Sequence, residues 1–168
     1  MKYIIRSLLL IVFIPSLSYG EDKHAQNKNT HAVGVEALSD PLRNLLSLEM
    51  KALQDGMMSI IPSYISGNWE DIAVTAEKMK NGFLLKQRLT ESQRKELHTA
   101  LPAAFIEKDQ RFHYLAGMLS HAAKKEKPEL INFYFSEMNE SCVNCHSQFA
   151  THKFPALAPD STAKKHSH

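Results

Sequence analysis

The sequence lacks several features that would assign it at once to a class of protein. Only two of its 168 residues are cysteines, and 20 Lys and Arg barely outnumber 18 Asp and Glu. A chain so evenly charged carries no basic footprint for nucleic acid. Its apolar run at residues 8–14 is far shorter than the about 20 residues of a membrane-spanning helix. No stretch shows the alternation of a β-strand, which favours an all-α protein.

The N-terminus has the three parts of a secretory signal. Lys2 and Arg6 precede the apolar run, and the small residues Ser18 and Gly20 precede a polar stretch. We therefore predict a signal peptide over residues 1–20, and its cleavage would remove two basic residues and no acidic one.

Residues 21–38 are polar and aperiodic, so a flexible leader is expected there. A flexible tail is expected at 153–168, which leaves 39–152 for one folded domain.

Apolar residues in this domain recur at steps of three and four, as on amphipathic helices. The first stripe starts after the cap signal Ser39-Asp40-Pro41 and ends at Gly67. Its members are Leu42, Leu46, Met50, Leu53, Met57, Ile60 and Tyr64.

Local signals place the remaining helices. Asn68 is an N-cap candidate for a second helix, and Thr90 opens a capping box for a short one. Pro102 and Pro128 open the third and fourth long helices. Four long amphipathic helices with short links predict an antiparallel up-down four-helix bundle, whose core can house a cofactor.

The fourth helix carries the most specific motif, Cys142-Val143-Asn144-Cys145-His146. Two thiols at i and i+3 share one helix face. A CxxCH sequence predicts covalent c-type haem, with both sulfurs bonded to the porphyrin and His146 as proximal iron ligand. Two alternatives stay open: a redox dithiol, which usually opens a helix near a βαβ unit, and a zinc site that adds His152.

These features resemble the class II cytochromes c, the cytochrome c-prime and cytochrome c-556 family, across about Leu42 to Phe149. That family consists of four-helix bundles with CxxCH on the last helix. Met50-Lys51, followed by Met57-Met58 and Gly67, is similar to the first helix of its methionine-ligated members. The resemblance implies one covalent haem c on the C-terminal helix, with Met50 as the candidate distal iron ligand.

The chain departs from the family pattern near the expected propionates. No Arg follows the motif in Ser147–Ala150, and Arg43 is the single candidate for a propionate contact on the first helix. His98, His113 and His121 could ligate iron in principle, but surface or core histidines are more common.

The resemblance implies a periplasmic electron carrier that is not an enzyme and that meets redox partner proteins. The alternative is a five-coordinate protein of the cytochrome c-prime kind that binds nitric oxide or carbon monoxide. A peroxidase, the third class, needs a distal acid–base group such as His113 or His121. Family members are often dimers, so a homodimer is left open, although no stripe indicates a second interface. We expect no integral membrane segment and no nucleic-acid partner.

Overall fold

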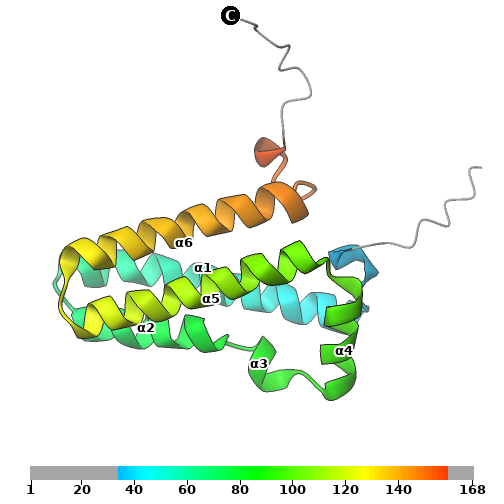
Figure 1. Ribbon diagram of the computed structural model, residues 1–168, viewed down its shortest axis with the longest axis horizontal. Helices are drawn as coiled ribbons and strands as arrows, with labels where there is room; N and C mark the ends of the chain where they lie inside the picture. The colour runs from blue at the N-terminus through cyan, green and yellow to red at the C-terminus, as the bar shows by residue number, and fades with distance from the viewer. Residues whose placement is uncertain (1–33, 159–168) are drawn as a thin grey trace, which may run out of the picture. The chain divides into compact units, whose positions relative to one another are not determined.

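The computed structural model describes residues 34–158 (Figure 1), and this part of the chain is all-α, as predicted. The predicted signal peptide and most of the predicted leader and tail lie outside the described residues. None of the described helices is long and apolar enough to cross a membrane. The elements are 3-10 helix η1 (Val35–Ala37), α1 (Asp40–Ile65), α2 (Trp69–Asn81), α3 (Leu85–Arg88), α4 (Glu91–Ala100), α5 (Ala103–Lys124), α6 (Pro128–Phe149) and 3-10 helix η2 (Pro155–Leu157).

The long helices pack antiparallel into a bundle (Figure 1). α2 packs against both α1 and α5, and α5 also packs against α6. The short helices α3 and α4 connect α2 to α5, and α4 crosses the end of the bundle. Because α5 and α6 run in opposite directions, the end of α6 lies beside the start of α5.

Helix boundaries follow the local signals in the sequence. The Asn68 side chain accepts a hydrogen bond from the Asp71 amide, 3.3 Å away, at the start of α2. The predicted capping box of α4 is confirmed: the Thr90 hydroxyl accepts from the Gln93 amide, and the Gln93 side chain accepts from the Thr90 amide. Gly67 closes α1 with a φ of 71°, a conformation that favours glycine.

Two clusters of buried apolar side chains form the core. The larger core cluster lies among α1, α2, α5 and α6 and comprises Leu53, Met57, Ile60, Ile72, Ala73, Ala76, Met79, Phe112, Leu115, Ala116, Leu119, Ala122, Ala123, Ile131 and Met138. The smaller core cluster comprises Leu38, Leu42, Leu46 and Leu101. The predicted first stripe supplies Leu42, Leu46, Leu53, Met57 and Ile60 to these clusters.

The segment before α1 is ordered where the structure describes it. Residues 34–38 fall within the predicted flexible leader, yet Leu38 is 2% exposed and belongs to the smaller core cluster. The Gly34 amide donates to the Ala100 carbonyl at 3.0 Å. This packing holds residues 34–38 against the end of α4. The contacts are long-range, so the local sequence of the segment does not predict them.

Candidate functional site

The cysteines of the motif lie in the last turns of α6 and are free thiols, each half-buried. Three residues apart on a helix, Cys142 and Cys145 share one face. The Cys142 side chain packs against the larger core cluster. Burial raises the pKa of both thiols above the usual value for cysteine. The pair therefore faces the bundle and is protonated at neutral pH.

The thiol pKa values bear on the redox-dithiol alternative. A redox CxxC pair depends on a thiolate whose pKa is lowered by a helix N-terminus or by a nearby cation. Here the motif lies at the C-terminal end of α6, and burial raises the pKa of Cys142 and Cys145. Both observations argue against dithiol chemistry.

The zinc alternative needs a fourth ligand that the fold does not bring close. Among the residues that the structure describes, no three His, Cys, Asp or Glu side chains are grouped so that they could hold a metal ion. His152, the proposed fourth ligand, instead has its Nδ1 atom 3.6 Å from a Glu36 carboxylate oxygen. The geometry of the described residues thus argues against a zinc site at the motif.

The imidazole of His146 follows the second cysteine and is half-buried. Burial lowers its pKa below the ordinary histidine value. The neutral form therefore dominates at neutral pH, and this is the form that can donate a nitrogen lone pair to a metal. Its ring stacks on that of Phe154, which follows the helix.

The half of α6 that carries the motif is less buried than the first half. Its first half buries Ile131 and Met138, but no residue of 139–149 is buried. The facing part of α5, residues 103–111, also has no buried residue. The two segments meet through the rings of Phe105 and Phe149, whose centroids are 5.4 Å apart. Side chains are therefore buried at the end of the bundle that holds Ile131 and Met138, and only half-buried or exposed around the motif.

Met50 is a half-buried side chain of α1 that contacts both core clusters. Cys142 also packs against the larger core cluster. The fold thus places both of these predicted site residues against the same cluster of apolar side chains. Cys145 and His146 are not among the residues packed against that cluster.

The candidate propionate contact, Arg43, has a different partner in this structure. Its guanidinium forms an ion pair with Asp40, one turn earlier on α1. The pair lies at the exposed start of the helix, and a propionate would have to compete with Asp40 for the guanidinium.

The other histidines considered are not gathered at the motif. The Nδ1 atom of His113 is hydrogen-bonded to the Met79 carbonyl at 2.7 Å, and its Nε2 atom is 3.5 Å from Asp109. The side chain thus joins α5 to α2. His121 is exposed. A distal acid–base role has no geometric support from either residue.

Sequence reasoning missed Glu49, a buried carboxylate in α1. It is 1% exposed and accepts hydrogen bonds from the backbone amides of Phe83, Leu84 and Leu85 at 2.8, 2.6 and 3.1 Å. The signal was present in the spacing, because Glu49 continues the series of Leu42 and Leu46 at steps of four and three. A glutamate at a core position implies buried polar partners.

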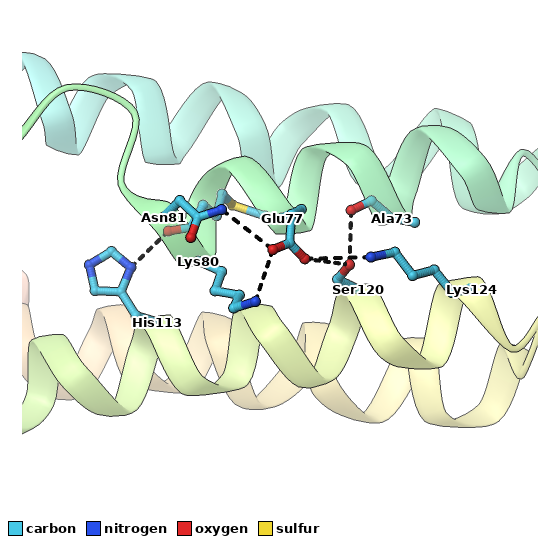
Figure 2. A network of polar contacts seen from close by, with 8 residues as sticks. Ala73, Glu77, Lys80, Asn81, His113, Ser120 and Lys124 are labelled. Atoms are coloured by element: carbon cyan, nitrogen blue, oxygen red, sulfur yellow. Dashed lines mark hydrogen bonds and ion pairs between the residues drawn. The ribbon is translucent and has the colours of Figure 1, made fainter. Parts of the chain in front are cut away.

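A second polar cluster joins α2 to α5 in another part of the bundle (Figure 2). Glu77 accepts from Lys80 at 2.9 Å and from Ser120 at 3.2 Å, and Lys124 lies 3.6 Å away. It borders a surface cavity of about 570 Å³ along α2. Lys124 ends α5, whereas the motif lies beside the start of that helix, so this cluster is separate from the motif.

Comparisons with protein-family models, with curated proteins and with solved structures find no match to this chain. The functional interpretation therefore depends on the chain's own residues and on the resemblance carried by its motifs.

Proposed function

We propose that this chain is an exported c-type cytochrome that carries electrons in the periplasm, a divergent relative of the class II cytochromes c. In this proposal the helices form an up-down four-helix bundle, with one haem c bound covalently to α6. Cys142 and Cys145 form the thioether bonds, His146 is the proximal iron ligand, and Met50 is the distal one.

The observation that carries the proposal is the position of the motif in the bundle. Two protonated, half-buried thiols and a neutral imidazole lie together where α6 buries no side chain of its own. The half-buried rings of Phe105 and Phe149 add apolar surface at this end of the bundle. The donor set suits haem c, since thioether formation uses two thiols and iron ligation uses a neutral histidine.

When bound, the haem supplies a one-electron couple between ferric and ferrous iron. Cys142 and Cys145 would fix that group through their sulfurs, and His146 and Met50 would supply ligands to its iron. Ligation by Met50 together with His146 would raise the reduction potential, and the apolar clusters beside Met50 and Cys142 would supply part of an apolar surrounding for the group. No substrate is transformed in this role, and redox partner proteins meet the chain in small, transient contacts.

A second candidate function has one observation in its favour. Met50 packs against both core clusters, and a methionine so placed can serve as core filler instead of a ligand. The iron would then be five-coordinate, with an apolar distal side that admits nitric oxide or carbon monoxide. Both candidates require the same haem attachment.

The deciding experiment is expression of the full chain with haem-attachment machinery. Intact mass measurement and the visible spectrum are recorded for the wild type and for a Cys142→Ala/Cys145→Ala double variant. We expect the wild type to gain the mass of one haem and the double variant to gain none. A low-spin ferric spectrum with an iron–thioether charge-transfer band supports the electron carrier. A high-spin spectrum that shifts with carbon monoxide supports gas binding, and a wild type without covalent haem overturns both.

A further inference from the structure

The chain folds back on its own motif directly after α6. The Ala150 carbonyl accepts hydrogen bonds from the amides of Lys153 and Phe154, both at 2.9 Å. This reversal brings the Phe154 ring over His146, with ring centroids 4.5 Å apart and ring planes inclined by 13°. The following helix η2 also lies against α6. The sequence predicts a flexible tail over residues 153–168, and in the structure residues 155–157 of this segment form η2 beside α6.

The contact between Phe154 and His146 takes the place of the hydrogen bond that a ligating histidine usually makes. A ligating histidine usually donates its second ring N–H to a carboxylate, carbonyl or water, which fixes the orientation of the ring. Within residues 34–158, the His146 ring has no hydrogen bond or ion pair, and its ring contact is the one with Phe154. A stacked neighbour covers a face of the imidazole and leaves both nitrogens free at its edge. The contact is therefore compatible with a bond from Nε2 to iron.

Resting on the proposed function, we propose that Phe154 is a positioning residue for the proximal ligand His146. Its ring holds the plane of the imidazole and shields one face from water. Phe154 lies beyond the end of α6 and is 41% exposed, so its ring is partly covered. In this role a stacked aromatic ring replaces the usual hydrogen-bond acceptor.

The test compares haem-loaded full-length variants. Phe154→Ala removes the stacked ring, and Phe154→Tyr keeps it. Phe133→Ala is the matched control, because Phe133 is also an exposed phenylalanine, on the first half of α6, with its ring against Tyr134. The readouts are the ferric electron paramagnetic resonance spectrum, which reports the orientation of the imidazole plane, and the reduction potential. If the iron is five-coordinate, the iron–histidine stretching band in the resonance Raman spectrum replaces the first readout.

We expect Phe154→Ala to broaden and shift the signal of the ligated histidine and to move the reduction potential. Phe154→Tyr and Phe133→Ala should match the wild type. If Phe154→Ala does not fold, Phe154→Leu keeps the apolar bulk without the flat ring, and a broadened signal in that variant supports the proposal equally well. If the folded variant without the ring has the same signal and reduction potential as the wild type, Phe154 does not position His146. That result leaves the proposed function unaffected. A wild type without covalent haem overturns the proposed function and this inference with it.

Discussion

The carboxylate of Glu49 in α1 accepts a hydrogen bond from the backbone amide of Leu84, 2.6 Å away and 35 residues later. The amides of Phe83 and Leu85 donate to the same side chain. These three amides lead into α3, a helix of four residues that cannot satisfy its own first N–H groups. Glu49 thereby fixes the connection after α2 to the first helix, one residue before the candidate ligand Met50.

Replacing Glu49 by alanine should lower the free energy of unfolding by about 3 kcal/mol. The substitution leaves three amides without their acceptor, and an unsatisfied buried group costs about 1–3 kcal/mol. Glu49→Gln keeps one acceptor oxygen, so its loss should be smaller. Urea unfolding measures both values, with Glu107→Gln on the exposed surface of α5 as the control. Equal stability of Glu49→Ala and the control would show that the amides find water instead.

Replacing Met50 by alanine distinguishes a ligand from core filler. In the haem-loaded protein, loss of an iron ligand should convert the ferric spectrum from low-spin to high-spin and remove the iron–thioether band. Met57→Ala is the matched control, since Met57 lies two turns later on α1 in the larger core cluster. Met57→Ala should lose about 2–5 kcal/mol of stability, because Met57 is buried, and Met50→Ala should lose less, because Met50 is only half-buried. A low-spin spectrum in Met50→Ala would assign the sixth ligand elsewhere.

The helix boundaries were predictable because their causes are local. Asn68, Thr90, Pro102 and Pro128 mark helix starts within a few residues, and each predicted start agrees with the structure. α3 and the partners of Glu49 could not be read in this way. The hydrogen bonds of Glu49 join residues 34–36 positions apart. The sequence around residue 85 contains no N-cap for α3, and the carboxylate of Glu49 serves that purpose from α1.

The candidate site depends on both local and long-range features of the chain. CxxCH is a local motif, so Cys142, Cys145 and His146 could be named from spacing alone. The stacking of Phe154 on His146 could not, because it depends on a chain reversal at Ala150 that follows from backbone hydrogen bonds. The role of Met50 depends on which residues meet across the bundle, and the choice of Met50 from sequence came from the resemblance.

The two halves of α6 should differ in their contribution to stability. Met138 is fully buried, whereas Val143, inside the motif, is 43% exposed. In the haem-free chain, Met138→Ala should cost about 2–5 kcal/mol because it leaves a cavity, and Val143→Ala should cost less than about 0.5 kcal/mol. Thermal unfolding followed by circular dichroism measures both. A large loss in Val143→Ala would mean that the end of α6 is packed more tightly than its exposure indicates.

The Glu77 cluster should make stability depend on acid pH. The ammonium of Lys80 donates to the carboxylate and lowers its pKa from 4.5 to about 2, assisted by Ser120 and Lys124. Because the pKa is lower in the folded chain than in the unfolded chain, the stabilising contribution is complete above about pH 4.5. It is lost as the pH falls from 4.5 toward 2.

Glu77→Gln should therefore be less stable than the wild type above pH 5, by about 1 kcal/mol or less. The side chain of Glu77 is 36% exposed, and solvent weakens ion pairs of this kind. The difference in unfolding free energy should shrink toward zero as the pH approaches 2, and it should also shrink in 1 M salt, where the Debye length is about 3 Å. Urea unfolding at several pH values, with Glu107→Gln measured in parallel, gives the comparison. A difference that stays constant from pH 7 to pH 2.5 would assign the loss to packing, because the contribution of a carboxylate whose pKa is lowered in the folded chain must decrease below about pH 4.5.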